Sequence, residues 1–325
     1  MYYIKNINLL IHKMKKRFYL ISLGLCLSTT FAFSQFGGFN APAPNVEASE
    51  KFLDVNYAND GQVYHNMDIY LPLEVKDSYK AVIVIYGSAW FTNNSKSMTV
   101  TSLGKPLLDA GFAIISINHR SSSDAAYPAQ INDVKAAIRY IRANAAKYKI
   151  DPSFIGITGF SSGGHLASMA GVTNGIKEHT IGSVTMDIEG NIGEFTSTSS
   201  KVNAVADWFG PVDMERMSNC EKPNDASSPE AALIKSNPAD SPDLVKMISP
   251  INFVDKNDPR FIVFHGDADN VVPHCQSMFF SETLEKAGIL EKMITAPGGG
   301  HGAGTFNDAN YKEMTDFFLK EASRK

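Results

Sequence analysis

Cysteine and tryptophan are scarce in this chain, and neither sign of charge dominates. Among 325 residues there are 3 cysteines and 2 tryptophans, and the formal net charge is −4. The basic residues form no stripe along the chain, so the composition gives no reason to expect a nucleic-acid partner. The cysteines and histidines do not have the spacing of metal ligands, so we expect neither a metal nor a cofactor.

Long apolar runs are missing as well. The longest candidate, residues 18–27, is too short to span a bilayer well, because a spanning helix needs roughly 20 apolar residues. Basic residues at 13–17 precede this run, and Ala32, Phe33 and Ser34 give it the small-x-small end of a cleavage site. The pattern predicts a secretory signal peptide over residues 1–34 and a periplasmic or secreted protein. A lipoprotein anchored at Cys26 is less favoured, because Leu25 stands where a small residue is expected.

Removal of the signal peptide leaves two cysteines, Cys220 and Cys275. An oxidising compartment permits them to pair. Their distance in the sequence favours neither a disulfide nor two free thiols, so both alternatives stay open.

Short apolar runs alternate with helical segments in most of the chain. The runs at 81–86, 112–117, 155–158, 202–208 and 261–264 are typical of parallel strands covered on both faces. Apolar residues recur at helical spacing over 129–146, and 276–287 and 310–322 also predict helices. Two further strands, 52–57 and 64–71, flank Asn59, Asp60 and Gly61, which predict a hairpin.

This order of elements predicts an α/β fold over residues 51–325, preceded by a flexible lead-in at 35–50. The sheet is expected to be mostly parallel, with helices on both faces and an antiparallel hairpin at one edge. Residues 171–201 and 220–250 interrupt the alternation. We expect these two insertions to form the walls of a pocket, since loops beyond the strand ends build the ligand site in such sheets; passive surface loops are the alternative.

A glycine-bracketed serine stands between a predicted strand and a predicted helix. Gly159, Ser161 and Gly163 form the G-x-S-x-G pattern of a nucleophile elbow, in which glycines allow a very sharp turn. Ser161 is therefore the candidate nucleophile. The start of the following helix favours a developing negative charge at this position.

A serine nucleophile needs a histidine to accept its proton and a carboxylate to orient that histidine. His301 lies in a glycine-rich loop after a predicted strand at 292–295, and it is the predicted base. Asp267 and Asp269 both follow the strand at 261–264, and Asp269 is preferred because it lies further out in the loop. His165 and His265 are expected to have structural roles.

The oxyanion formed by an attacked ester requires backbone N–H donors. Ser88 and Ala89, in the loop after an early strand, and Ser162, next to the nucleophile, are the predicted donors. Gly87, Trp90 and Trp208 are predicted to contact substrate. For the two tryptophans, packing in the core is the alternative.

The segments at 86–90, 118–128, 159–167, 208–213 and 265–273 together resemble the esterase/lipase group of the α/β-hydrolase fold. Within that group the chain is most similar to the BD-FAE subgroup, named for a bacterial feruloyl esterase. The resemblance begins near Phe52 and covers most of the chain. It implies hydrolysis of carboxylic esters, with acetyl or feruloyl groups of plant polysaccharides as the substrate class.

One motif departs from that group, which usually has His-Gly-Gly-x-Trp in the oxyanion loop. This chain has Tyr86 in place of the histidine and Ser88 in place of the second glycine. The sequence therefore predicts a serine ester hydrolase that acts on a small-molecule or polysaccharide ester. Two alternatives remain: a serine peptidase similar to prolyl oligopeptidases, and a catalytically silent carbohydrate-binding protein.

Overall fold

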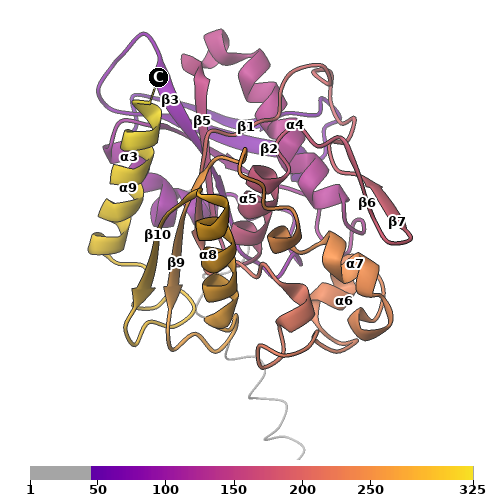
Figure 1. Ribbon diagram of the computed structural model, residues 1–325. Helices are drawn as coiled ribbons and strands as arrows, with labels where there is room; N and C mark the ends of the chain where they lie inside the picture. Colours follow the sequence, from indigo (N-terminus) through magenta and orange to yellow (C-terminus); the bar gives the residue numbers. More distant parts are fainter. Residues whose placement is uncertain (1–44, 325) are drawn as a thin grey trace, which may run out of the picture. The chain divides into compact units, whose positions relative to one another are not determined.

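An eight-stranded sheet forms the centre of residues 45–324, the part of the chain that the computed structural model describes (Figure 1). The predicted signal peptide and most of the lead-in lie outside the described residues. In spatial order the strands are β1 (Glu50–Asn56), β2 (Asn66–Leu71), β4 (Ala113–Ile117), β3 (Tyr79–Ile85), β5 (Ile150–Phe160), β8 (Ala204–Trp208), β9 (Arg260–Gly266) and β10 (Leu290–Ala296).

From β4 to β10 all neighbouring strands are parallel, while β1 pairs with β2 and β2 with β4 in antiparallel register. The predicted α/β fold and its antiparallel edge are confirmed. Since the carboxyl ends of parallel strands share one edge of a sheet, the loops after β3, β5, β9 and β10 begin along that edge.

Helices cover both faces of the sheet. Alternate residues of a strand point to opposite faces, and in β3 Ile83 and Val84 belong to two separate apolar clusters. The cluster with Ile83 includes residues of α4 (Ala129–Ala143), α5 (Ser162–Val172) and α8 (Cys275–Ala287). The cluster with Val84 includes α3 (Lys105–Asp109) and α9 (Asp308–Ala322), which lie together away from α4 and α5 in Figure 1. The double cover explains why the predicted strands are apolar throughout.

The edge hairpin differs in detail from the prediction. The second strand begins at Asn66 and not at residue 64, because residues Val63–His65 form a 3₁₀ turn. His65 is held in this turn by Asp60, 2.7 Å from its Nδ1, and by Asp133 of α4, 3.2 Å from its Nε2. The chain therefore follows a longer connection than a two-residue hairpin turn.

Three further features were not predicted. A short helix α2 (Ser97–Thr99) continues through a π-helical turn, residues 100–104, into α3. The first insertion contains a separate hairpin of β6 (Glu178–Ile181) and β7 (Val184–Asp187), and the second contains α6 (Pro229–Ile234) and α7 (Pro242–Met247).

Within residues 45–324, no helix combines the length and the apolar character needed to cross a bilayer.

Cys220 and Cys275 form a disulfide, which decides between the two alternatives left open by the sequence. Cys275 is the first residue of α8, and Cys220 lies in the long connection between β8 and β9. Gln276, the next residue of α8, accepts hydrogen bonds from the N–H groups of Val212 and Asp213. Covalent and polar contacts thus hold this connection to the start of α8.

Candidate active site

Ser161 lies at the sharp turn between β5 and α5. Its backbone dihedrals are φ 56° and ψ −127°, a conformation that residues with a Cβ rarely adopt. A Cβ on Gly159 would lie 2.3 Å from the carbonyl oxygen of Gly163, and a Cβ on Gly163 would lie 2.3 Å from that of Ile85. Both positions therefore require glycine, and the turn presents Ser161 at the carboxyl edge of the sheet.

Three side chains from distant parts of the sequence meet at this edge. His301, in the loop after β10, has its Nε2 2.9 Å from Ser161 Oγ and its Nδ1 2.8 Å from Asp269 Oδ2. A carboxylate only accepts hydrogen bonds, so Nδ1 carries the hydrogen of a neutral ring and Nε2 offers its lone pair to the serine hydroxyl. A hydroxyl in this arrangement is ready to lose its proton as it attacks.

Asp269 is held from several sides. Its side chain is fully buried, and Oδ1 accepts hydrogen bonds from the N–H groups of Val271 (2.8 Å) and Val272 (3.0 Å). Burial raises the pKa of the Asp269 carboxyl, but hydrogen bonds from His265 and His301 lower it by more, so the net pKa lies below the usual range. Asp269 is therefore ionised at neutral pH, as the partner of a histidine base must be.

The alternative acid, Asp267, has a different neighbour. It is exposed, and its Oδ1 accepts a hydrogen bond from the N–H of Gly298 at 2.6 Å. Asp267 thus links the loop after β9 to the glycine-rich loop that carries His301. The two aspartates have separate contacts although they are only two positions apart.

His265, for which only a structural role was predicted, contacts the candidate acid directly. Its Nε2 lies 3.4 Å from Asp269 Oδ2 and 3.0 Å from the carbonyl oxygen of Val272. Since a carbonyl only accepts, Nε2 carries a hydrogen and is directed at both acceptors. Nδ1 lies 2.6 Å from Oγ of Ser277 on α8. A histidine four positions before the candidate acid was the only sequence signal, and no pattern indicated Ser277.

The two tryptophans are core residues, which corrects the prediction that they contact substrate. Trp90 is 1% exposed and Trp208 is 0% exposed. Trp208 stacks on Phe264 with ring centroids 4.0 Å apart, and Trp90 donates from Nε1 to Nδ1 of His165 at 3.2 Å. Burial of such large aromatic rings stabilises the folded protein more than their exposure to solvent would.

His165 has the structural role predicted for it. It is fully buried, and its Nε2 donates to the carbonyl oxygen of Ile248 at 2.8 Å. Burial lowers the pKa of His165 to about 4, so the ring is neutral at neutral pH. A neutral ring is required here, because Nδ1 must accept from Trp90 while Nε2 donates.

Gly87 lies against the candidate nucleophile. A Cβ at this position would be 2.7 Å from Cβ of Ser161 and 2.7 Å from the carbonyl oxygen of Phe160. The preceding Tyr86 is buried, stacks on His119 with centroids 4.8 Å apart, and donates from its hydroxyl to the carbonyl oxygen of Thr92. Tyr86 therefore anchors the start of the oxyanion loop, while a contact of Gly87 with substrate stays a prediction.

The oxyanion loop makes a tight turn that changes one predicted donor. Phe91 N–H donates to the carbonyl oxygen of Ser88 at 3.0 Å, and the central residues Ala89 and Trp90 have φ of 51° and 60°. The N–H of Ser88 donates to Oγ of Ser162 at 2.9 Å, so in this structure it is engaged and not directed at a substrate. Ala89 and Ser162 remain the candidate donors, and Ser162 begins α5, where the helix leaves its N–H unused.

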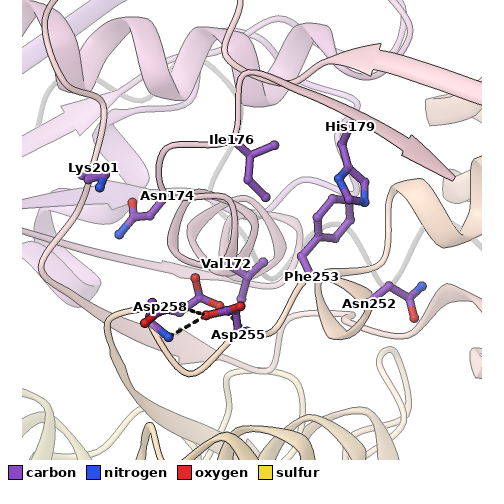
Figure 2. Close-up of a pocket in the computed structure, with 10 residues that line it drawn as sticks. Val172, Asn174, Ile176, His179, Lys201, Asn252, Phe253, Asp255 and Asp258 are labelled. Carbon is purple, nitrogen blue, oxygen red and sulfur yellow. Dashed lines mark hydrogen bonds between the residues drawn. The ribbon is translucent and has the colours of Figure 1, made fainter.

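A cavity of about 450 Å³ lies near the amino ends of two strands, at the edge of the sheet opposite Ser161. Figure 2 shows side chains that line it. Lys201 and Asp258 border it shortly before the amino ends of β8 and β9, whereas Ser161 follows the carboxyl end of β5. The first insertion contributes Ile176 and His179 to its lining. The prediction that the two insertions wall the substrate site stays a prediction. The full lining is Val172, Asn174, Ile176, His179, Lys201, Asn252, Phe253, Asp255, Asn257 and Asp258.

Metal ligands are not gathered anywhere in the described part of the chain. Among residues 45–324, no group of three histidine, cysteine, aspartate or glutamate side chains is arranged to hold a metal ion.

Known proteins resemble this chain in sequence or in fold to different extents. The esterase LipQ of Mycobacterium tuberculosis is 33% identical over 251 residues, which are 76% of this chain and 56% of LipQ. A solved structure described as a truncated form of a carbohydrate esterase from gut microbiota is 61% identical with a TM-score of 0.86, covering 87% of this chain and 100% of that one. A bifunctional GH43-CE protein of Bacteroides eggerthii is 59% identical with a TM-score of 0.84, covering 86% of this chain and 36% of that one.

The chain thus spans just over half the length of LipQ. A family model described as BD-FAE matches residues 67–284. That match contains Ser161 and Asp269, while His301 follows it. Given the length of the match and the α/β-hydrolase fold, the chain belongs to the BD-FAE family.

Proposed function

We propose that this protein is a serine carboxylic-ester hydrolase. The observation that carries the proposal is the position of the His301 ring, 2.9 Å from the Ser161 hydroxyl on one side and 2.8 Å from the Asp269 carboxylate on the other. This pair of contacts is what general-base activation of a serine requires. The relatives described as esterases add independent support.

In the proposed reaction, Ser161 Oγ attacks the ester carbonyl carbon while His301 Nε2 takes the hydroxyl proton. The N–H groups of Ala89 and Ser162 stabilise the oxyanion that forms. As the tetrahedral intermediate collapses, the C–O bond to the alcohol breaks and His301 returns its proton to the leaving oxygen. Water, activated by the same ring, then hydrolyses the acyl-enzyme and restores Ser161. Asp269 keeps the ring oriented and stabilises its charged form throughout.

We propose acetyl or feruloyl groups on plant polysaccharide as the substrate class. Support comes from the 61% identical protein, which is described as a carbohydrate esterase, and from the GH43-CE protein, whose description joins two enzymatic activities in one chain. Incubation with acetylated xylan and with feruloylated arabinoxylan separates the two acyl groups. Release of acetate or of ferulate supports the proposal, whereas cleavage of p-nitrophenyl acetate without release of either contradicts the polysaccharide assignment.

A periplasmic or secreted location is part of the proposal. It is supported by the signal-like pattern at residues 1–34 and by the disulfide between Cys220 and Cys275, because disulfides persist in oxidising compartments. Fractionation of expressing cells, followed by thiol labelling with and without reductant, tests location and pairing together.

The central experiment compares the wild-type protein with Ser161→Ala. The variant is expected to keep its far-UV circular dichroism and to lose hydrolysis of p-nitrophenyl acetate. Labelling of Ser161 by a fluorophosphonate probe excludes the silent carbohydrate-binding alternative, and a peptide substrate assay addresses the peptidase alternative. Unchanged ester hydrolysis by Ser161→Ala would contradict the proposal.

A further inference from the structure

The side chain of Ser162 makes a contact that the reaction described above does not use. Its Oγ accepts the N–H of Ser88 at 2.9 Å, and Ser162 is only 1% exposed. The bond joins the oxyanion loop to the first residue of α5, directly beside the nucleophile. It therefore connects the two segments that must supply the oxyanion donors.

The loop needs such a contact because its conformation is unfavourable. Ala89 and Trp90 both have positive φ, which brings their Cβ atoms close to backbone oxygens. Turns with two such central residues usually contain glycine or asparagine. This chain has neither at those positions, so the loop depends on tertiary contacts to keep its shape.

Other hydrogen bonds hold the parts of the loop before and after Ser88 and Ala89. Trp90 donates from its ring to His165 and accepts the N–H of Ser122 at its carbonyl oxygen at 2.7 Å. The Tyr86 hydroxyl binds the carbonyl oxygen of Thr92. None of these bonds involves the N–H groups of Ser88 or Ala89. The Ser162 hydroxyl accepts the N–H of Ser88 and so holds the part of the loop that follows Gly87, next to Ser161.

We propose that the Ser162 hydroxyl is a positioning group that holds the oxyanion loop against the nucleophile elbow, so that the N–H groups of Ala89 and Ser162 form the oxyanion hole. The inference rests on the proposed ester hydrolysis and adds a role for one side chain. In this proposal the N–H of Ser88 donates to the Ser162 hydroxyl and does not bind the oxyanion. A hydroxyl at position 162 is therefore required for full activity although it does not touch the reacting atoms.

The test uses three variants assayed with p-nitrophenyl acetate. Ser162→Ala removes the acceptor, and we expect kcat to fall about tenfold with KM changed less than about twofold, the effect of one net hydrogen bond expressed in the transition state. Ser162→Thr keeps the hydroxyl and is expected to restore most of the rate. Ser281→Ala removes another buried serine hydroxyl, one without a partner among the described residues, and is expected to leave kcat unchanged.

A second measurement does not depend on catalysis. Amide hydrogen exchange at Ser88 is expected to be slow in the wild-type protein and at least about tenfold faster in Ser162→Ala, because the amide loses its acceptor. The proposed positioning role of the Ser162 hydroxyl is wrong if Ser162→Ala is as active as the wild type or more active, or if amide exchange at Ser88 is unchanged. Activity that persists in Ser161→Ala contradicts the proposed function instead, so the two failures are distinguishable.

Discussion

His265 approaches the same carboxylate oxygen of Asp269 that His301 contacts, with Nε2 3.4 Å from Oδ2. Two imidazoles thus face one buried acid. In the proposed reaction the ring of His301 gains and loses a proton. The ring of His265 takes no part in that transfer and is held in place by hydrogen bonds with Ser277 and with the carbonyl oxygen of Val272. The fixed ring gives the carboxylate a constant orientation while the other ring changes charge.

A matched pair of substitutions tests this role of His265. Gln places an amide N–H near the position of Nε2, while Asn places its amide near Nδ1. We therefore expect His265→Gln to retain most activity and His265→Asn to lower kcat roughly tenfold with little change in KM, because one hydrogen bond to a charged group is lost. Steady-state kinetics with p-nitrophenyl acetate provide the comparison. Equal rates for the two variants would show that the Nε2 donor is irrelevant to catalysis.

The two aspartates of the same loop are expected to differ strongly. Asp269→Asn removes the charge that orients His301 and is expected to lower kcat by 10³–10⁴, about the effect known for the acid of serine-protease triads. Asp267→Asn keeps an oxygen to accept the Gly298 N–H, so kcat is expected to stay within about threefold of the wild type. A larger loss for Asp267→Asn than for Asp269→Asn would reverse the assignment of the acid.

Features fixed by local chemistry were predictable from the sequence. The apolar runs at 81–86 and 261–264 are buried on both faces, and Gly159 and Gly163 occupy positions that exclude a Cβ. In contrast, β6 and β7 are only four residues long each and contain no fully buried residue, so their alternation is too short and too weakly apolar to indicate strands. Such short segments predict an irregular insertion and not a hairpin.

Other features depend on tertiary contacts that a linear pattern does not contain. An aromatic side chain can pack in the core or stack on a sugar ring, and the sequence is the same in both cases. Only the burial of Trp90 and Trp208 in the folded protein shows that these two rings pack in the core. Similarly, the motif around residue 88 predicts an oxyanion donor. That its N–H binds Ser162 follows from the distance between two segments 74 positions apart.

The buried His165 predicts a loss of stability in mild acid. Its pKa is lowered from 6.5 to about 4 in the folded protein by burial. Between about pH 6.5 and pH 4, His165 therefore binds a proton in the unfolded chain but not in the folded protein. The free energy of unfolding has its full contribution from His165 above about pH 6.5 and loses it as the pH falls towards 4. The loss amounts to about 3 kcal/mol over this range.

His165→Gln provides the control, because a glutamine amide supplies one donor and one acceptor without titrating. Urea unfolding of both proteins at several pH values measures the difference in free energy of unfolding. We expect the free energy of unfolding of the wild type, minus that of His165→Gln, to decrease as the pH falls from 6.5 to 4. A difference that is independent of pH would show that His165 does not titrate differently in the two states.

The disulfide is expected to contribute substantially to stability. It closes a loop with a sequence separation of 55 residues, for which chain-entropy arguments give about 4 kcal/mol. Replacement of both Cys220 and Cys275 by serine is expected to lower the free energy of unfolding by about this amount, with Tm as a second readout. Reductant should lower the Tm of the wild type but not of the double variant. A wild-type Tm that does not respond to reductant under denaturing conditions would contradict pairing in solution.

Gly87 offers a test of how closely the oxyanion loop approaches the nucleophile. An added methyl group would lie 2.7 Å from Cβ of Ser161, nearer than side-chain atoms tolerate. Gly87→Ala should therefore displace either the loop or the serine, and we expect kcat to fall by at least about 100-fold, as for loss of an oxyanion donor. Gly288→Ala is the matched control, because Gly288 has φ 77° at the end of α8 and no atom within 4 Å of an added Cβ. It should cost about 1 kcal/mol in stability through backbone strain and leave kcat unchanged. If Gly87→Ala keeps wild-type kcat, the loop is not held in the position that oxyanion stabilisation requires.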